Sequence, residues 1–316
     1  MPPITIVVVA YQSAATLPAL FDAARACHEA GLVGRVVVVD NASTDATATL
    51  LAAQPAWVHA IHAPHNLGFG RGCNLGAEQV ETKYTLLLNP DASIGAEALR
   101  TMLEFMQAHP RAGVVGPATL CGRDADAPVL QPTGPLPTAG SIAYAALRNA
   151  ASGGLRPIVP GSTPFVTGWV CGAVFLIRTA LYRQLGGFDP RFFLYWEETD
   201  LCRRVAATGH QVWALGSATA HHIAAASSAD DATRIAGCIG RHYYQSRRHY
   251  LIKHDGWLAA TAAELVEWAA LCARTAADVL RGRGAARIRP RRQARLLTRP
   301  AAPLSPQGQG KNARSC

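Results

Sequence analysis

The sequence lacks the cysteine spacing that small zinc-bound or disulfide-linked proteins share. Its eight cysteines are scattered over 316 residues, and none of them forms a CxxC pair. This pattern excludes a zinc ribbon and indicates no disulfide framework. Most of these cysteines stand in apolar runs, so we expect small buried side chains in a reducing compartment.

Long hydrophobic runs are absent as well. No stretch of about 18 uncharged apolar residues occurs, which argues against a membrane-spanning helix, and residues 1–10 lack the basic start of a signal peptide. We therefore expect a cytoplasmic protein. Charged residues are scarce, at 16% of the chain, whereas apolar residues make up 49%. This balance predicts a sizeable buried core.

Acidic residues are missing from the C-terminal end. Residues 281–316 contain ten Lys and Arg and no Asp or Glu. Without those ten cations, 20 Lys and Arg face 21 acids, so residues 1–280 are close to neutral although the whole chain has a net charge of +9. We predict that this basic tail is disordered and that an anionic membrane surface is one partner to test. No nucleic-acid reader module is recognisable, so nucleic acid is not expected.

Apolar, β-branched runs alternate with helical patterns over the first 118 residues. Residues 4–10, 36–39 and 85–88 are continuous apolar runs of strand length, as in parallel strands buried on both faces. Helical patterns lie at 17–30, 46–53, 73–80 and 96–108. The alternation predicts a doubly wound α/β unit.

The pattern changes after residue 118. Residues 121–164 are rich in Pro and Gly and predict a long loop with one short helix near 142–148, and a loop of this length is usually functional or mobile. A predicted strand at 166–178, a helix at 197–208 and a strand at 212–215 follow. Residues 257–280 predict a helix with one polar stripe and a broad apolar face. Such a helix either docks on the domain or lies on anionic lipid.

Polar residues close the second apolar run. Asp40 and Asn41 follow it directly, and in open α/β sheets ligands bind at the carboxyl ends of the strands. Both side chains are therefore placed to meet a base or a ribose. Ser43 fits the same site, but it can also be an N-cap of the next helix. Tyr11 follows the first apolar run in the same way.

A glycine-rich segment at residues 65–76 opens the third helical pattern. It contains Asn66, Gly68, Arg71 and Asn74, and the backbone N–H groups of such a loop can approach phosphate. Arg71 could meet a phosphate and Asn74 could order the loop, whereas a purely structural turn is the alternative. The glycine spacing matches no dinucleotide motif, which disfavours an NAD-dependent oxidoreductase.

The third apolar run ends in Asn89 and Asp91, with a proline between them. A turn is the plain interpretation of this sequence. A carboxylate at the tip of a central strand also suits Mg²⁺ or Mn²⁺, which would bridge a diphosphate. The pair His221 and His222 follows the last predicted strand, and by itself it is weak evidence for a metal.

Three acids, Glu197, Glu198 and Asp200, open the helical pattern that begins at residue 197. A carboxylate beside a cleft can remove a hydroxyl proton. Acids in a first turn also compensate the helix dipole, and Asp200 stands four residues before Arg204, as in an ordinary ion pair. Trp196, beside these acids, could stack on an acceptor sugar ring.

These motifs occur in the order and at the approximate spacing of the family 2 inverting glycosyltransferases. Together with the run at 169–178 they resemble the rhamnosyltransferase branch of that family over roughly residues 4–228. The resemblance implies a GT-A-type α/β fold, which is a Rossmann-like nucleotide-sugar-binding domain with a doubly wound mixed sheet. It implies a dTDP- or UDP-sugar donor, with L-rhamnose favoured, and a lipid-linked or cell-surface glycan as the acceptor.

The resemblance also implies roles for individual residues. Asp91 corresponds to the metal ligand for Mg²⁺ or Mn²⁺, and a histidine, His221 ranked above His222, would approach the metal. Glu198 corresponds to the catalytic base, with Glu197 as the alternate. The other implied contacts are with the nucleotide (Tyr11, Asp40, Asn41, Ser43, Asn66, Gly68, Arg71 and Asn74) and with the sugar or acceptor (Asn89, Trp169, Gly172, Trp196 and Asp200).

The chain departs from the family pattern at three places. The base position holds Glu198 where the family has Asp, Ala10 and Gln12 replace the usual Thr and Asn of the first loop, and residues 224–226 are Ala where Gly is usual. Two other functions therefore stay open. One is a catalytically inactive relative that binds a glycan or nucleotide-sugar, and the other is a sugar-nucleotide nucleotidyltransferase.

The predicted organisation places a glycosyltransferase domain at residues 1–228. Its nucleotide-binding half would be 1–118 and its acceptor half 119–228, followed by a helical segment at 229–280 and the basic tail. The predicted reaction is a single in-line displacement at the cytoplasmic face of the membrane, with the protein peripheral on the inner face of the plasma membrane.

Overall fold

The structure, a computed structural model, describes residues 2–122, 129–148, 154–223 and 232–282, with side chains from residue 240 onward in the last range. The chain divides into two compact units. The first unit contains residues up to 134, 156–189 and 198–229, and the second contains 135–155, 190–197 and the chain from 230. The predicted domain boundaries at 228 and 280 stay predictions, and the tail from residue 283 lies outside the described residues.

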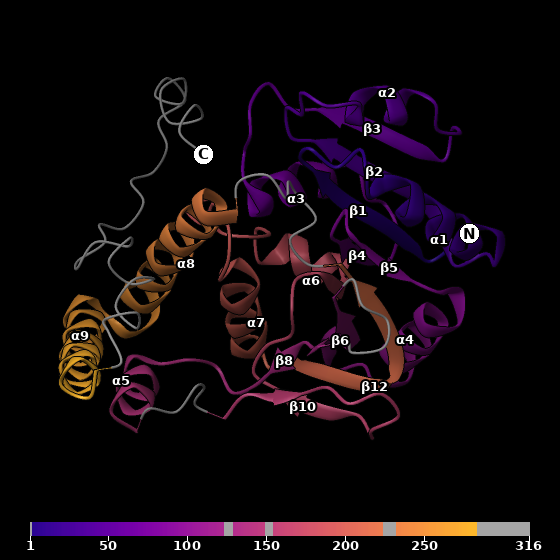
Figure 1. Cartoon of the computed structure of the whole chain (residues 1–316). Coiled ribbons are helices and arrows are strands. Elements are labelled where there is room, and N and C mark those ends of the chain that lie inside the picture. The colour runs from indigo at the N-terminus through magenta and orange to yellow at the C-terminus, as the bar shows by residue number, and fades with distance from the viewer. Residues whose placement is uncertain (1, 123–128, 149–153, 224–231, 283–316) are drawn as a thin grey trace. The chain divides into compact units, whose positions relative to one another are not determined.

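One mixed sheet forms the centre of the first unit (Figure 1). Its strands are β1 (Ile4–Ala10), β2 (Val33–Asp40), β3 (Val58–His62), β4 (Tyr84–Leu88), β5 (Ala92–Ile94), β6 (Ala112–Cys121), β7 (Val129–Leu130), β10 (Phe165–Thr167), β11 (Val174–Arg178) and β12 (Gln211–His222). The order is β10-β12-β6-β11-β4-β1-β2-β3, with β5 beside β12 and β7 beside β6. The strands β1 to β4 pair in parallel, and β11 is antiparallel to both neighbours. The predicted mixed α/β fold is confirmed.

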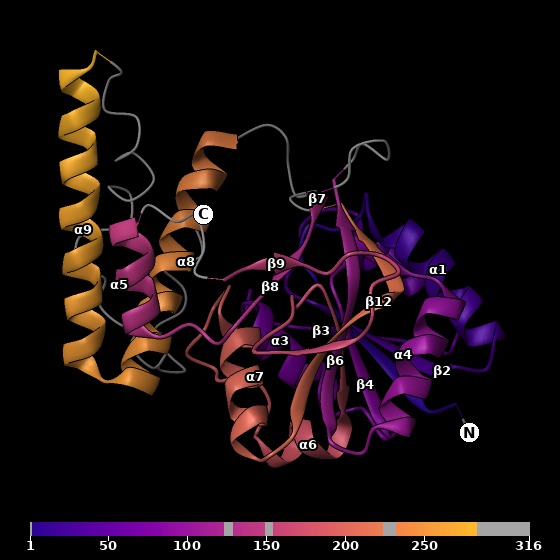
Figure 2. The same cartoon turned by 90° about the horizontal axis from the view of Figure 1, so that it is seen from below.

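Helices cover both faces of this sheet. They are α1 (Leu17–Glu29), α2 (Thr47–Ala52), α3 (Phe69–Ala77), α4 (Ala96–Ala108), α6 (Thr179–Gln184) and α7 (Glu197–Ala207). Because successive side chains of a strand point to opposite faces, Ile6 and Val8 pack with α1 and α4, whereas Val7 and Val9 pack with α3, α6 and α7. Figure 2 shows these two helical layers on either side of the strands.

Two glycines set how closely α3 lies on the sheet. A Cβ atom on Gly72 would come within 2.8 Å of the Val9 side chain, and one on Gly76 would come within 2.6 Å of Val7. Real Cβ atoms do not approach so closely, so only glycine permits this packing. Part of the glycine-rich motif therefore serves helix–strand packing, in addition to any contact with phosphate.

The predicted strand at 166–178 is two strands. β10 is antiparallel to β12 at one edge of the sheet, whereas β11 lies in the interior between β4 and β6. Residues 168–173 connect them, because Gly168 and Gly172 interrupt the apolar run. The last strand is also longer than the predicted 212–215, since β12 continues to His222. A short two-stranded sheet joins β8 (Pro132–Thr133) to β9 (Arg156–Pro157).

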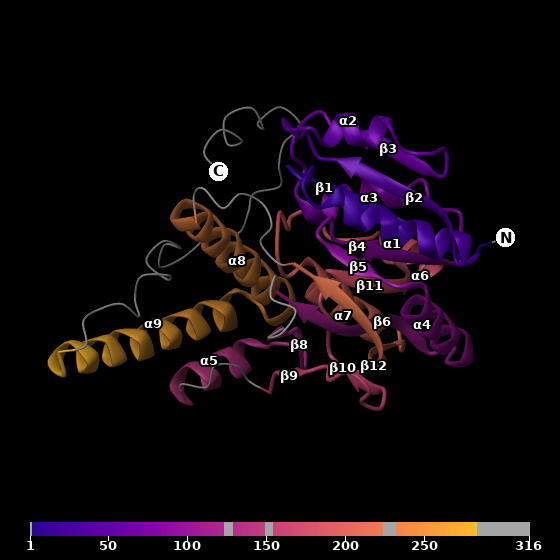
Figure 3. The ribbon, with the colours of Figure 1, turned by 45° about the vertical axis from the view of Figure 1, so that its right-hand side comes forward.

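The second unit is helical. α5 (Ala139–Arg148) and α8 (Ala232–Asp255) each pack on α9 (Trp257–Leu280), and Figure 3 shows α5 running beside α9. The short helix predicted near 142–148 is thus present as α5. The core of this unit consists of Ala139, Phe192, Trp196, Tyr250, Leu251, Ala260 and Ala263.

The polarity of α9 is the reverse of what its sequence suggests. Its acidic residues point inward, where Glu264 accepts a hydrogen bond from Arg248 at 2.5 Å and Glu267 accepts two from Arg247 at 2.8 and 2.5 Å. Leu258 of its apolar face is 77% exposed. None of the helices in the described part of the chain combines the length and apolar character needed to cross a bilayer.

Candidate functional site

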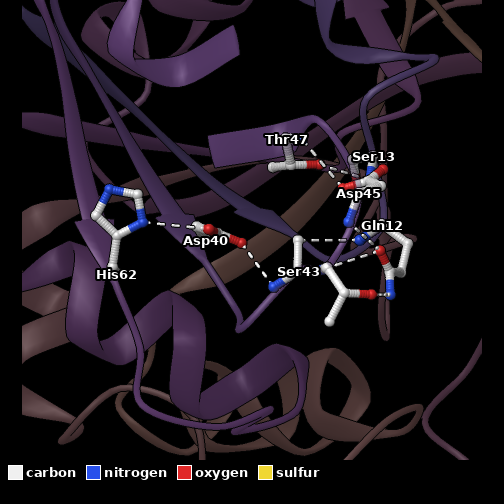
Figure 4. A network of polar contacts seen from close by, with 8 residues as sticks. Gln12, Ser13, Asp40, Ser43, Asp45, Thr47 and His62 are labelled. Carbon is white, nitrogen blue, oxygen red and sulfur yellow. Dashed lines mark hydrogen bonds and ion pairs between the residues drawn. The ribbon is translucent and has the colours of Figure 1, made fainter. Parts of the chain in front are cut away.

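The loops after β1 and β2 are joined by a polar network (Figure 4). Asp40, at the end of β2, accepts a hydrogen bond from the Ser43 backbone N–H at 3.0 Å, and its other oxygen lies 3.2 Å from His62 Nδ1. The Gln12 N–H donates to Ser43 Oγ at 3.0 Å. Asp40 is only 4% exposed, so its carboxylate is held in one orientation at the sheet edge.

Asn41 ties the glycine-rich loop to the end of β2. Its Oδ1 accepts from the Leu67 N–H at 2.8 Å, and its Nδ2 donates to Asn66 Oδ1 at 2.9 Å. The same Asn66 oxygen accepts from the Gly68 N–H at 2.9 Å. Asp40, Asn41, Ser43, Asn66 and Gly68 therefore lie together, as the sequence predicts.

The first turn of α3 carries an unsatisfied cation. Arg71 Nη1 is buried, and it has no hydrogen-bond partner within the described part of the chain. A buried guanidinium N–H without an acceptor is costly, and a phosphate oxygen would satisfy it. Tyr11, also predicted for the nucleotide, is 39% exposed at the end of β1.

Asn74 joins α3 to the turn after α6. Its Nδ2 donates to Phe188 O at 2.8 Å, while its Oδ1 accepts from the Phe188 N–H at 2.8 Å and from Tyr182 Oη at 2.5 Å. These bonds suit the ordering role that the sequence also allows for Asn74, and its contact with the nucleotide stays a prediction.

A second polar cluster lies beyond the end of β4. His222 Nε2 is 3.1 Å from Asp91 Oδ1 and 3.3 Å from Asn89 Nδ2, and His222 Nδ1 is 3.8 Å from Cys121 Sγ. His221 is exposed and points to the other face of β12. Strand alternation thus turns His222 toward Asp91, whereas the sequence ranks His221 first.

Neighbouring groups set the charge of His222. Burial alone would lower the pKa of this imidazole, but the hydrogen bonds and charges of Asp91 and Cys121 outweigh burial and raise the pKa to about 9. At neutral pH His222 therefore carries a proton, which holds the Asp91 carboxylate beside it.

Glu198 lies at the same end of the strands as this cluster. The Asn89 N–H donates to Ala173 O at 2.9 Å, which joins the end of β4 to the turn before β11. In that turn, a Cβ built on Gly172 would lie 3.4 Å from Glu198 Cβ and 3.8 Å from Phe69. Gly172 thus leaves room for both side chains, and it brings Glu198 close to the start of α3.

The other residues of the acidic motif are more enclosed. Glu197 is 4% exposed and Asp200 is fully buried, whereas Glu198 is half-buried. Asp200 accepts from Arg204 Nε at 2.8 Å, so the ordinary ion pair that the sequence predicts is present. Trp196 is 8% exposed and packs 5.2 Å from the Tyr250 ring, which leaves little of the indole for a sugar.

Trp169 lies in the connection between β10 and β11. It is half-buried, its carbonyl accepts from the Thr133 hydroxyl, and Thr133 is fully enclosed. The indole Nε1 is buried and has no hydrogen-bond partner among the described residues. A ligand hydroxyl is a suitable acceptor for such an N–H.

Two residues of the site have no signal in the sequence motifs. His62 faces Asp40 because β2 and β3 are in parallel register at these positions, and Cys121 faces His222 through the pairing of β6 with β12. Only strand register could have identified them. Within the described residues, no group of three or more His, Cys, Asp or Glu could hold a metal by itself.

Comparison with known proteins places these features in one family. Residues 5–156 match the model of the family described as Glycosyl transferase family 2. An N-acetylglucosaminyl-diphospho-decaprenol L-rhamnosyltransferase of Mycobacterium tuberculosis is 27% identical over 247 residues, which cover 71% of this chain and 77% of that protein.

Solved structures share the fold at lower identity. A mannosyltransferase of Pyrobaculum calidifontis in complex with GDP-Man and Mn²⁺ is 17% identical, with a TM-score of 0.51 over 87% of this chain and 76% of that one. TarS residues 1–349 of S. aureus, in complex with UDP, is 18% identical, with a TM-score of 0.50 over 80% and 70%. The motifs, the matched domain and this shared GT-A fold support a family 2 glycosyltransferase that is rhamnosyltransferase-like.

Proposed function

We propose that this glycosyltransferase moves a sugar, with L-rhamnose as the first choice, from a nucleotide-diphospho-sugar to a hydroxyl of a lipid-linked glycan, with inversion. The mycobacterial relative is an L-rhamnosyltransferase that acts on a lipid-linked acceptor, and this supports both the sugar and the kind of acceptor. The observation that carries the proposal is that Asp91, His222 and Glu198 lie at the same end of the strands in the sheet of the first unit.

The side chains at the end of β2 and in the first turn of α3 would bind the nucleotide part of the donor. Asp40 and Asn41 are held at the end of β2, where a base and ribose bind in open α/β sheets. Arg71, whose Nη1 lacks an acceptor among the described residues, would bind a phosphate of the dTDP- or UDP-sugar. Phosphate contacts of this kind fix the donor without selecting the sugar.

Asp91 and His222 would hold a divalent cation, Mg²⁺ or Mn²⁺. The two side chains already lie 3.1 Å apart. Asp91 would offer a carboxylate oxygen, and His222 would offer a nitrogen once the cation displaces the imidazole proton. Two protein ligands fit such a cation, because the remaining positions go to water and to the diphosphate. The bound metal would neutralise the charge that develops on the leaving diphosphate.

Glu198 would act as the base. It is half-buried beside Gly172, and it would accept the proton of the acceptor hydroxyl as that oxygen attacks the anomeric carbon. Attack opposite the leaving diphosphate inverts the anomeric configuration. Glu197, at 4% exposure, is the less accessible of the two acids and stays the alternate.

The test is a transfer assay with dTDP-L-rhamnose, Mn²⁺ and a synthetic N-acetylglucosaminyl-diphospho-lipid. We expect Glu198→Gln to lower kcat by about 10²–10⁴-fold, because the proton acceptor is lost, while binding of dTDP is unchanged. Glu197→Gln should retain most activity, and Glu104→Gln, an exposed position on α4, serves as the matched control. Unchanged turnover of Glu198→Gln would remove it from the role of base.

The same assay separates the proposal from its rivals. Donor binding without transfer to any acceptor, and without donor hydrolysis, would indicate a binding protein. Release of diphosphate from dTTP with a sugar phosphate would indicate a nucleotidyltransferase. NMR of the product linkage reports whether the configuration is inverted.

A further inference from the structure

One face of α9 is an uncharged row with the spacing of a coiled coil. Its members recur in alternating steps of four and three residues, and each of them is exposed within the described part of the chain. This row, called here the α9 seam, consists of Leu258, Ala262, Leu265, Ala269, Cys272, Ala276 and Val279. A repeat of 3.5 residues keeps such a row facing a partner helix along its whole length.

The seam faces outward because the other sides of α9 pack on α5 and α8. Glu264 and Glu267 of α9 are turned toward α8, where Glu264 is 1% exposed and pairs with Arg248. The large members of the seam stay open, with Leu258 at 77%, Leu265 at 52% and Val279 at 53% exposure. Salt bridges inside and leucine outside reverse the usual arrangement of a surface helix, so the apolar side lacks a cover among the described residues.

The composition of the seam fits a helix better than a lipid surface. Three of its seven members are alanines, which add little apolar area to drive insertion between lipids but allow two helices to approach closely. A lipid-bound helix also tends to carry Lys or Arg on the polar face that borders its apolar face. The positions beside the seam carry none, and they are Ala259, Val266, Ala273 and Ala277 on one side and Thr261, Trp268 and Thr275 on the other.

We propose that the α9 seam is a homodimer interface, in which two copies of the chain pair their α9 helices antiparallel. In this orientation large residues meet alanines in three successive layers. Leu265 lies against the partner's Ala276, Cys272 against the partner's Ala269, and Val279 against the partner's Ala262. One register gives all three layers, and the two-fold axis repeats each of them, so the seam is complementary to itself.

A parallel pair would be poorer on two counts. It would place alanine opposite alanine at three layers and large residues opposite each other at the rest, so gaps and crowding would alternate. It would also start both basic tails, with eight arginines between residues 281 and 299, at the same end, where like charges repel. Antiparallel pairing starts them at opposite ends.

The size of the seam predicts a dimer of moderate affinity. In this register the seam pairs over residues 262–279, which span roughly 27 Å at 1.5 Å per residue. Two such helices at close distance bury on the order of 1,000 Å² in total, which is the lower end for specific interfaces. The dimer should therefore dissociate on dilution.

Sedimentation velocity of the full-length chain between about 1 and 100 μM tests the interface. We expect wild type to shift from monomer to dimer over this range. Ala269→Glu should stay monomeric with an unchanged melting temperature, because it places a charge in the middle of an apolar layer. The matched control, Ala26→Glu on the exposed side of α1, should dimerise like wild type. A monomeric wild type, or a dimeric Ala269→Glu, would overturn the proposal.

Disulfide trapping tests the orientation. With Ala269→Cys, oxidation should link the new thiol to the partner's Cys272 and give a covalent dimer, whereas wild type should give none through Cys272. Replacing Cys272 by Ser in the Ala269→Cys chain should abolish the link. A parallel dimer would give the opposite pattern, with wild type linked through Cys272 and the double variant still linked through residue 269.

Discussion

The two units of this chain use polar and apolar side chains in opposite ways. In the first unit the apolar residues fill both faces of a sheet, and the polar residues collect where its strands end, as at Asp40 and Asp91. In the second unit the ion pairs of Arg247 and Arg248 are enclosed between α8 and α9, and leucines point outward. The charged groups thus lie at the candidate site in the first unit and between packed helices in the second.

This difference predicts that substitutions in the two units will change different measured quantities. A polar residue at a strand end has solvent or ligand on one side, so its loss removes an interaction with substrate and little folding energy. A charged side chain enclosed between two helices does not contact the substrate. Its removal leaves the opposite charge of its partner buried and unpaired. Activity and stability should therefore respond to different units.

The largest effect is expected at Asp91. Asp91→Asn keeps the shape of the side chain and removes the charge that would hold the cation, so we expect turnover with Mn²⁺ to fall by roughly 10³-fold. The melting temperature should stay within a few degrees of wild type, and Asp22→Asn, an exposed acid on α1, should leave both unchanged. Full activity of Asp91→Asn, or activity of wild type in EDTA, would show that this strand end does not serve a metal.

The next effect is expected inside the second unit. Arg248→Met leaves the carboxylate of Glu264 buried without its cation, which should lower the free energy of unfolding by about 3–5 kcal/mol. Adding Glu264→Leu should restore most of that loss, because the pair is then replaced by apolar groups. The control is Arg100→Met, since Arg100 and Glu97 form an exposed pair at 3.9 Å that contributes under about 0.5 kcal/mol. Urea titration measures all four proteins, and equal losses for the two arginine variants would contradict the comparison.

Much of the first unit can be predicted from the sequence because its signals are local. Continuous β-branched runs predict β1, β2 and β4, and the polar residues after each run predict which side chains gather at the sheet edge. Asp40 and Asn41 lie at the end of β2, Asp91 lies just beyond the end of β4, and Asn66 of the glycine-rich loop contacts Asn41.

What the sequence could not predict depends on pairing between distant segments. His62 and Cys121 join the site only through strand register, and His222 replaces His221 because β12 continues to that residue with its alternation intact. The outward seam of α9 has the same origin, since its apolar periodicity is visible in the sequence but the side that faces α8 is set by two arginines on another helix.

A smaller effect on stability is expected at Asn74. Asn74→Ala removes two hydrogen bonds to the Phe188 backbone and one from Tyr182, and unsatisfied buried groups should lower the free energy of unfolding by about 1–3 kcal/mol. Asn74→Asp keeps both accepted bonds and should lose less. Chemical denaturation distinguishes the two variants. An equal or larger loss for Asn74→Asp would contradict a stabilising role for the two accepted bonds.

The smallest effect is expected from the titration of His222 in metal-free protein. Its pKa is raised from 6.5 to about 9, so the folded state binds this proton more tightly than the unfolded state does. The resulting stability is fully present below pH 6.5 and is lost as the pH rises through 9. With EDTA present, the melting temperature of wild type should fall between pH 6.5 and 9.5 by about 2–4 °C more than that of His222→Gln. His221→Gln, on the other face of β12, should follow wild type, and parallel curves for wild type and His222→Gln would mean that the pair with Asp91 does not hold the proton.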